Sequence, residues 1–265
     1  MELPPNLRLI SSKDGSLNAF NAHFGEHYAN MGEGAFSEKL AKHIAPVWEA
    51  LAANQAKSPK PQVWILDLCF GLGYNALLSR LFSAFDQMEF CIISIELDRQ
   101  NLALASKIHA LDSSSMAQLE SSGQARIAHN VSLQIFWGDA CALLADLQTN
   151  LAQRYSHFHG FDVIYQDPFS YEKNRELWDF RHFCTLASLL KDSGIITTYA
   201  TRKEVIANAQ QAGLLAYRYK VDPRTLAMLS QMCARFYPSS LSTHKRSSSI
   251  FSKAPINISG STARS

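Results

Sequence analysis

The stretch from Val63 to Ala76 constrains the fold most tightly, because a short apolar run there ends at two glycines and continues as an amphipathic segment. Val63 to Leu66 are bulky and apolar without alternation, which is typical of a parallel strand buried on both faces. Gly71 and Gly73 allow the backbone to come close to a ligand, where a Cβ atom would collide with it. The helix that follows would point its first free N–H groups at the same place. The stretch therefore predicts a strand, a tight turn and a helix around a nucleotide-like cofactor.

The glycine spacing alone does not identify the cofactor. Gly71, Gly73 and Ala76 also satisfy the loose dinucleotide fingerprint, and an ordinary strand-to-helix turn can contain such glycines for packing. Asp67 favours a cofactor with a positive charge at this place, such as the amino group of S-adenosylmethionine, because a pyrophosphate would need hydrogen-bond donors. Glu96 ends the next apolar run, about 20 residues after the glycines, and is placed to accept both ribose hydroxyls of an adenosine.

Apolar runs alternate with helical patterns over most of the chain, which is typical of a doubly wound parallel sheet. Strands are expected at residues 63–66, 90–95, 131–136, 161–166, 194–199, 214–219 and 249–252. Helices are expected at residues 35–53, 99–121, 175–190, 202–211 and 225–236. The sequence therefore predicts an α/β fold with helices on both faces of a mostly parallel seven-stranded sheet. In such folds, ligands bind at the carboxyl ends of the strands.

We expect three parts along the chain. Residues 1–62 should form a hairpin around Asp14 and Gly15 and then a helix, which together cover the cofactor side. Residues 63–253 should form the main cofactor-binding domain, and residues 254–265 a flexible tail. A chain of 265 residues, 47% of them hydrophobic, is long enough for one large domain with a substantial core.

Composition disfavours several classes of protein. The sequence shows neither a signal peptide nor a membrane-spanning run, so we expect a cytoplasmic protein without membrane contact. Five widely spaced cysteines predict reduced thiols, and the nine histidines show no metal-binding spacing. We expect no metal site. The sequence also lacks the G-x-S-x-G motif of the nucleophile elbow in serine hydrolases. The sequence does not indicate the oligomeric state.

Basic residues are concentrated in the last quarter of the sequence. Residues 1–201 contain 15 basic and 21 acidic side chains, whereas residues 202–265 contain 10 basic and 2 acidic ones. This quarter, which includes Lys245 and Arg246, is a candidate surface for a polyanion. A solubilising tail has the same composition, so charge alone leaves both interpretations open.

Two further strand ends carry acidic residues. Gly138 and Asp139 follow the third expected strand, where Asp139 either accepts a hydrogen bond from an adenine amino group or caps the next helix. Asp167, Pro168 and Phe169 follow the fourth. Asp167 and the Pro168 carbonyl would accept hydrogens from an amine and steer its lone pair toward a methyl donor, while Phe169 would exclude water. An acid followed by proline also starts many plain turns.

A carboxylate beside the amine has a disadvantage for methyl transfer. It stabilises the ammonium form, which has no free lone pair to accept a methyl group. Lys173 either opposes this effect by lowering the pKa of the amine or binds an RNA phosphate.

Several motifs occur together within residues 13–219: Asp14-Gly15-Ser16, Tyr28 with Gly34-Ala35 and Glu38, Phe70-Gly71-x-Gly73, and Asp167-x-Phe169-Ser170 with Lys173-Asn174 and Leu177-Trp178. In these motifs the chain resembles the methyltransferase domain of the MnmC family of tRNA wobble-uridine modification enzymes and its stand-alone relatives. The sequence departs from that family at three positions. Cys69 stands where the cofactor loop usually has another glycine, and Tyr171 and Arg175 stand where proline is common.

The resemblance implies that residues 63–253 form a methyltransferase domain of the Rossmann-like class I S-adenosylmethionine-dependent type. It also implies that the protein is an S-adenosylmethionine-dependent N-methyltransferase. Its substrate would be 5-aminomethyluridine, with or without a 2-thio group, at the tRNA wobble position, and its product 5-methylaminomethyluridine. Asp167 would be the substrate-side acid, Phe70 part of the cofactor loop and Tyr28 a substrate contact. Full-length relatives also carry a flavin-dependent oxidase domain, which we do not expect in a chain of this length, so the aminomethyl group should be made elsewhere. An NAD-dependent oxidoreductase and an inactive methyltransferase-like RNA-binding module are the alternatives.

Overall fold

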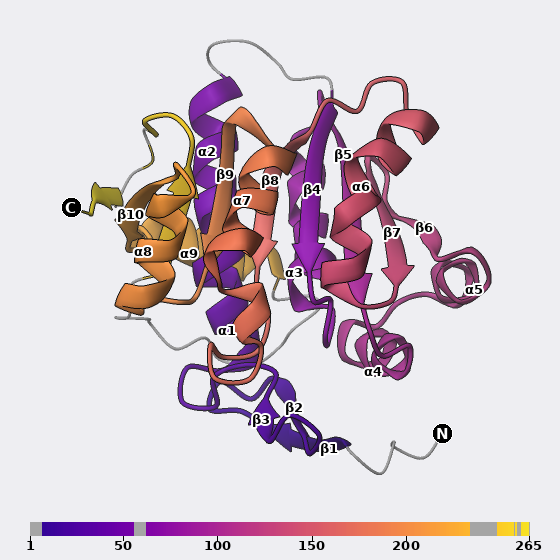
Figure 1. Cartoon of the computed structure of the whole chain (residues 1–265). Coiled ribbons are helices and arrows are strands. Elements are labelled where there is room, and N and C mark those ends of the chain that lie inside the picture. The colour runs from indigo at the N-terminus through magenta and orange to yellow at the C-terminus, as the bar shows by residue number, and fades with distance from the viewer. Residues whose placement is uncertain (1–6, 56–61, 234–247, 257, 259–260, 265) are drawn as a thin grey trace.

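The computed structural model describes residues 7–55, 62–233, 248–256, 258 and 261–264 (Figure 1). Within this part of the chain, the central sheet has nine strands in the order β12-β10-β11-β9-β8-β4-β5-β7-β6. Their bounds are β4 (Gln62–Leu68), β5 (Glu89–Glu96), β6 (Gln124–Ala128), β7 (Val131–Trp137), β8 (Phe161–Gln166), β9 (Leu190–Thr198), β10 (Leu215–Tyr219), β11 (Ser248–Ser252) and β12 (Ser261–Ala263).

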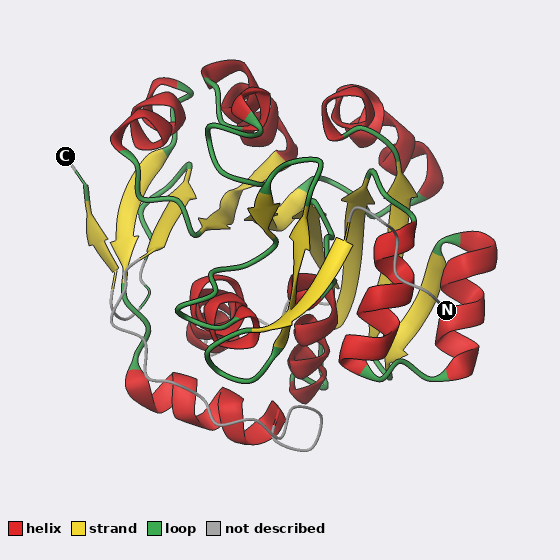
Figure 2. Ribbon diagram, turned by 90° about the horizontal axis from the view of Figure 1, so that it is seen from below, coloured by secondary structure: helices red, strands yellow, loops and turns green. Residues whose placement is uncertain are grey.

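Helices cover both faces of this sheet (Figure 2). One layer consists of α6 (Ala140–Arg154), α7 (Phe180–Leu189) and α8 (Lys203–Gln211). The opposite layer contains α1 (Ala35–Lys39), α2 (Ala45–Gln55), α3 (Tyr74–Leu78), the 3₁₀ turn η2 (Ser79–Ala84), α4 (Gln100–His109) and α9 (Pro223–Cys233). Trp64 and Leu66 of β4 pack into the first layer, while Val63 and Ile65 pack into the second. Because both faces are buried, β4 is apolar without alternation.

The parallel core confirms the predicted fold class. β4 pairs in parallel with both β5 and β8, β5 pairs in parallel with β7, and β8 pairs in parallel with β9. The carboxyl ends of these strands therefore meet at one edge, toward which their arrows point in Figure 1. All seven expected strands form. The prediction of seven strands is too low, since β6 and β12 add antiparallel edges to the sheet.

Within residues 254–265, which were expected to form a flexible tail, one described segment forms a strand. Ser261–Ala263 form β12, which pairs antiparallel with β10. The serine-rich composition does not reveal this pairing, because an edge strand needs little apolar side-chain area and its hydrogen bonds come from the backbone.

Two of the expected helices are interrupted. The segment predicted as one helix at 99–121 forms α4 and then α5 (Ser113–Ser122), because Ala110 has a left-handed φ of 48° and Asp112 caps the second helix. The segment predicted at 175–190 begins with the 3₁₀ turn η3 (Arg175–Leu177), and α7 starts afresh where Asp179 accepts from the N–H of His182. Both interruptions occur at aspartates, which favour helix N-caps over helix interiors.

The N-terminal residues form a separate three-stranded antiparallel sheet of β1 (Leu7–Ser11), β2 (Leu17–Asn21) and β3 (Glu26–His27). This sheet lies below the carboxyl edge of the central sheet in Figure 1. The β1–β2 hairpin turns at Asp14 and Gly15, as predicted. Side chains of this turn cap α1: the N–H groups of Ala35, Phe36 and Ser37 donate to Ser12, Ser16 and Asp14, respectively.

The first long helix contains a π-helical turn, η1 (Leu40–Ile44), between α1 and α2. Pro46 follows two residues later, and proline lacks the N–H needed for a regular helical bond and crowds the preceding turn. The widened turn lies where proline disturbs the hydrogen-bond ladder. All residues of α1 and η1 are buried, including the charged ones.

No helix in the described ranges is both long enough and apolar enough to cross a lipid bilayer.

Candidate active site

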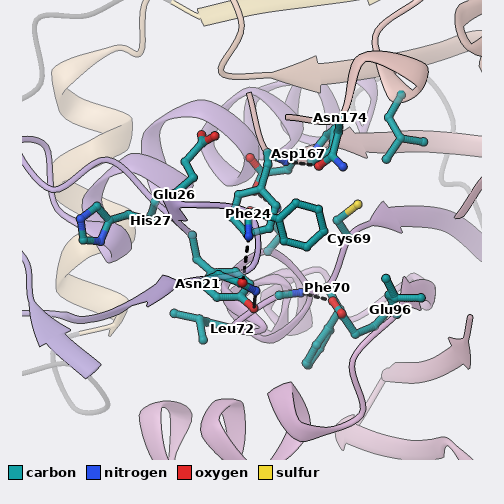
Figure 3. A pocket seen from close by; sticks show the side chains of 18 of the residues that line it. Asn21, Phe24, Glu26, His27, Cys69, Phe70, Leu72, Glu96, Asp167 and Asn174 are labelled. Atoms are coloured by element: carbon teal, nitrogen blue, oxygen red, sulfur yellow. Dashed lines mark hydrogen bonds between the residues drawn. The ribbon is translucent and has the colours of Figure 1, made fainter. Parts of the chain in front are cut away.

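A cavity of about 570 Å³ lies between the N-terminal sheet and the carboxyl ends of the central strands. Gly71 and Asp167 both line it, so the glycine turn and the acid–proline stretch open into one space. Figure 3 shows Asp167 and Asn174 on one side of this space and Phe70 and Glu96 on the other. The predicted site residues on the cavity wall are Tyr28, Phe70, Gly71, Glu96, Gly138, Asp139, Asp167, Pro168 and Phe169.

The turn after β4 is built on left-handed backbone conformations. The angle φ is 65° at Cys69, 54° at Gly71 and 77° at Gly73. A Cβ atom on Gly71 would lie 3.0 Å from the ring of Tyr28, and one on Gly73 would lie 2.8 Å from the ring of Phe70. Gly71 therefore keeps the cavity open beside Tyr28, whereas Gly73 permits close packing beneath the turn and is not on the cavity wall.

Glu96 ends β5 and faces the glycine turn. Its carboxylate accepts from the N–H of Gly71 at 2.7 Å and from the N–H of Asp98 at 2.8 Å. Burial raises the pKa of Glu96, while the two backbone donors favour its ionised form. A carboxylate has about four acceptor positions, so this one is oriented by the backbone and still has capacity for ligand hydroxyls.

Gly138 and Asp139 occupy the end of β7. The N–H of Gly138 donates to the carbonyl of Glu96 at 2.8 Å, which brings the two strand ends together. Asp139 caps α6 by accepting from the N–H of Ala142 at 2.9 Å. The structure therefore shows the capping role. Asp139 also lines the cavity, and its contact with an adenine amino group stays a prediction.

Asp67 does not occupy the position expected from the sequence. β4 continues through Leu68, so Asp67 lies inside the sheet, fully buried, and not on the cavity wall. One carboxylate oxygen accepts from the hydroxyl of Ser94 at 2.8 Å, and burial raises the pKa of Asp67 to about 7. The expected direct contact between Asp67 and a positively charged cofactor group is therefore wrong for this arrangement.

Asp167 directly follows β8 and is enclosed by side chains from the second helix layer. The ammonium of Lys39 lies 2.8 Å from Oδ1 and 2.7 Å from Oδ2, and the Asn75 amide donates to Oδ2 at 2.8 Å. Nε2 of His43 lies 3.5 Å from Oδ1. Burial alone would raise the pKa of Asp167, but the ammonium of Lys39 holds that pKa well below its usual range. Asp167 is consequently an ionised, ion-paired carboxylate.

Two residues predicted to assist amine binding have other surroundings than expected. The carbonyl of Pro168 accepts from the hydroxyl of Tyr199 at 3.0 Å, so one of its two acceptor positions is already used. Lys173 is exposed and does not line the cavity. The cation beside Asp167 is Lys39, which reaches it from α1.

Aromatic rings close the cavity beside Asp167. The Phe169 ring lies 4.7 Å from that of Phe24 and 5.1 Å from that of Tyr28, between ring centroids. The indole N–H of Trp178 donates to the Phe169 carbonyl at 2.7 Å, which fixes this residue from behind. The next residue, Ser170, donates through its hydroxyl to Glu26 of β3 at 2.7 Å. The N-terminal sheet and the segment after β8 thus form one apolar wall, and apolar walls exclude water.

Sequence reasoning missed Lys39, His43, Asn75 and Tyr199. The first two lie in a helix whose apolar positions predicted one buried face, so their charges seemed to belong to a solvated face. The available signal was the number of titratable residues in that segment, Glu38, Lys39, Lys42 and His43. Their Asp167 partner is too distant in sequence for any spacing rule to indicate.

Lys245 and Arg246 lie outside the described residues. Across the described ranges, no group of three or more His, Cys, Asp or Glu side chains could hold a metal ion.

Comparisons with known proteins agree with this geometry. Residues 103–231 match the family described as S-adenosyl-L-methionine-dependent methyltransferase. Among solved structures, MnmC2 from Aquifex aeolicus is similar with a TM-score of 0.66 and 22% identity, covering 96% of this chain and 72% of that one. The rRNA methyltransferase AviRa from Streptomyces viridochromogenes is similar with a TM-score of 0.41 and 18% identity, covering 84% of this chain and 87% of that one. Among curated proteins, none matches this chain.

The cavity fits the cofactor that the family match names. Gly71 leaves room where a Cβ atom would press on Tyr28, and Glu96 is held by two backbone donors with acceptor capacity left for hydroxyls. The family match over residues 103–231 and the methyltransferase fold together indicate an S-adenosylmethionine-dependent methyltransferase, whose fold is similar to that of MnmC2.

Proposed function

We propose that this protein methylates the amine of 5-aminomethyluridine, with or without a 2-thio group, at the wobble position of tRNA. The observation that carries the proposal is the shared cavity, in which the cofactor turn at Gly71 and the acidic residue Asp167 face one space. The likeness of the fold to MnmC2 and the motif resemblance around Asp167 support the same substrate class. A tRNA substrate would also account for the basic last quarter of the chain and would place the protein in the cytoplasm.

The residues of the site divide into two groups by what they would hold. Glu96, Gly71, Phe70 and Asp139 would hold the cofactor at the ends of β4, β5 and β7. When bound, S-adenosylmethionine supplies a methyl group on a positively charged sulfur.

The acceptor side of the cavity orients an amine and keeps water away. Asp167 has acceptor capacity beyond its contacts with Lys39 and Asn75, so it can accept one amine hydrogen and direct the lone pair away from itself. Phe24, Tyr28 and Phe169 present apolar ring surface, on which a pyrimidine base can stack. An oriented amine in a dry site reacts faster because its approach is already arranged.

The direct test is incubation with tRNA from cells that lack the modification, followed by mass spectrometry of the nucleosides. We expect methylaminomethyluridine to appear only when S-adenosylmethionine is present. A wild-type protein that binds S-adenosylmethionine but leaves this tRNA unchanged would support the inactive RNA-binding module instead.

Asp167→Ala should reduce methyl transfer by at least about a hundredfold while cofactor binding is retained, because the acceptor loses its orienting group. Asp112→Ala is the matched control, since Asp112 only caps α5 and does not line the cavity. The test measures the methyl-transfer rate of both variants and, by calorimetry, their affinity for the cofactor. Undiminished transfer by Asp167→Ala would contradict the role of this residue.

The basic last quarter should contribute to tRNA binding through phosphate contacts. Replacing Lys245 and Arg246 with alanine should weaken tRNA binding and reduce the slope of log affinity against log salt by about one per lost contact. Filter binding at several salt concentrations measures this slope, and an identical slope in the variant would assign these residues to a solubilising role.

A further inference from the structure

Lys39 is a buried cation on the wall of the catalytic cavity. Its ammonium contacts both carboxylate oxygens of Asp167, at 2.8 and 2.7 Å, and each of the two side chains is only 6% exposed. The pair joins α1 to the end of β8. Unlike most lysines, Lys39 thus has its charge inside the protein, at the place where the acceptor is expected to bind.

The other charged groups near the pair are two acids, Glu33 and Glu38, and one further cation, Lys42. Glu38 lies 3.7 Å from the Lys39 ammonium, but its closer partner is Lys42 at 3.0 Å, which also contacts Glu33 at 3.0 Å. Burial lowers the pKa of His43, so this ring is neutral near pH 7.

The remaining neighbours contribute no second cation. From α3, Asn75 is uncharged, and the Tyr199 ring from the end of β9 lies 5.6 Å from the Lys39 ammonium. Asp67 is buried in β4, and burial raises its pKa to about 7. Lys39 is therefore the cation that neutralises Asp167 among the described residues.

This neutralisation addresses a conflict in the chemistry of amine methylation. A carboxylate is useful because it orients the amine, yet an unpaired carboxylate nearby favours the ammonium form, which cannot react. A carboxylate that already holds a lysine can accept a hydrogen bond without presenting a full uncompensated charge. The geometry supplies this combination at Asp167.

We propose that Lys39 is a positioning residue that offsets the charge of Asp167, so that the acceptor amine occupies the cavity as the free base. This inference rests on the proposed amine acceptor. Lys39 acts through Asp167 and need not touch the substrate or the cofactor.

The test compares Lys39→Met with Lys39→Arg. In the methionine variant, the acidic limb of the plot of kcat against pH should shift to higher pH by about one to three pH units, because the amine keeps its proton more strongly. Transfer at pH 7 should then fall about tenfold or more and recover at pH 9. The arginine variant keeps the charge, so its limb should stay within about half a unit of the wild type. A methionine variant that is slow at every pH, with an unmoved limb, would overturn the inference.

Affinity for S-adenosylhomocysteine, measured by calorimetry, separates this role from a cofactor contact. Both variants should bind within about threefold of the wild type. A loss of tenfold or more in Lys39→Met would assign Lys39 to the cofactor and would also overturn the inference.

Thermal melting at pH 8 tests the pairing without any substrate. Lys39→Met leaves a buried carboxylate without its counter-ion and should melt well below the wild type. The double variant Lys39→Met, Asp167→Asn removes both charges and should regain most of that loss. A double variant no more stable than the single one would disprove the pairing, even if the single variant does not fold.

Failure of the inference can be distinguished from failure of the proposed function. A wild-type protein that does not methylate unmodified tRNA sinks the function, and the amine role of Lys39 with it. If the wild type is active and the acidic limb of the kcat–pH plot is the same in Lys39→Met, only the inference about Lys39 is wrong.

Discussion

Cys69 holds a conformation that favours glycine. Its φ of 65° lies in the left-handed region, and its side chain lines the cofactor cavity between Leu68 and Phe70. Any residue with a Cβ atom is strained there by about 1–2 kcal/mol. The cysteine thus occupies this position at an energetic cost.

Cys69→Gly should therefore be more stable than Cys69→Ala, since both remove the thiol but only glycine relieves the backbone strain. A difference of about 1 kcal/mol would raise the melting temperature of the glycine variant by about 2–4 °C over the alanine variant. Calorimetric melting without ligand measures this. Equal melting temperatures would show that the turn relaxes around a Cβ atom.

Individual site residues were predictable when the chain itself placed them. Glu96 and Asp167 each follow an apolar run, and parallel strands end at one edge, so their meeting near Gly71 followed from the pattern. Lys39 was not predictable, since it lies 128 positions from Asp167 and its contact depends on a helix buried on every side. Asp67 was misplaced because the strand extends two residues beyond its apolar run.

At the scale of elements, the start of α1 depends on the hairpin before it. Ser12, Asp14 and Ser16 accept from the first three N–H groups of this helix, which have no partners inside the helix itself. Burial would raise the pKa of Asp14, but hydrogen bonds from Ser16 and Ser37 lower it. The hairpin therefore caps α1 with side chains that lie about twenty residues earlier in the sequence.

Gly34 allows this cap to form. It has a φ of 97°, and a Cβ atom built on it would lie 2.0 Å from Cγ of Asp14. Gly34→Ala should therefore destabilise the protein by about 2–4 kcal/mol, combining backbone strain with displacement of the capping carboxylate.

Gly213→Ala is the matched control, because Gly213 also has a positive φ, 84°, but a Cβ atom there meets nothing within 4 Å. It should cost only the backbone strain, about 1 kcal/mol. Urea unfolding of both variants gives the two values. If they are equal, the contact with Asp14 contributes nothing measurable.

Elements with strong apolar patterns were predicted well, and those defined by caps or edges were not. The seven main strands have buried side chains on one or both faces, which fixes their pattern. β6, β12 and the interruption between α4 and α5 depend on backbone pairing or on a single left-handed residue, Ala110. Such features leave little trace in hydrophobic periodicity.

At the scale of the whole molecule, the N-terminal sheet closes the cavity by a few polar contacts. The hydroxyl of Tyr28 donates to Asn101 of α4 at 3.2 Å, and Glu26 accepts from Ser170. The hydroxyl of Tyr74 also donates to the carbonyl of Leu17 at 2.7 Å. These contacts lie on both the cofactor side and the acceptor side. A ligand bound beneath the sheet would be retained by them.

Ligand binding should consequently slow the opening of this sheet. Hydrogen exchange of backbone amides in residues 17–31 should decrease at least several-fold with saturating S-adenosylhomocysteine, because the ligand binds only the closed arrangement tightly. Exchange in α5, at the far edge of the central sheet, serves as the internal reference and should not change. Unaltered exchange in residues 17–31 would show that the ligand enters and leaves without moving the sheet.

The capped helix has a consequence for protein engineering. Lys39 occupies the last turn of α1, whose beginning is fixed by a hairpin made some twenty residues earlier. Grafting this acceptor pocket onto another methyltransferase scaffold would require residues 7–44 to be transplanted as one block. A graft of the helix without its hairpin would include Lys39 but not the capping hydrogen bonds that fix the position of the helix.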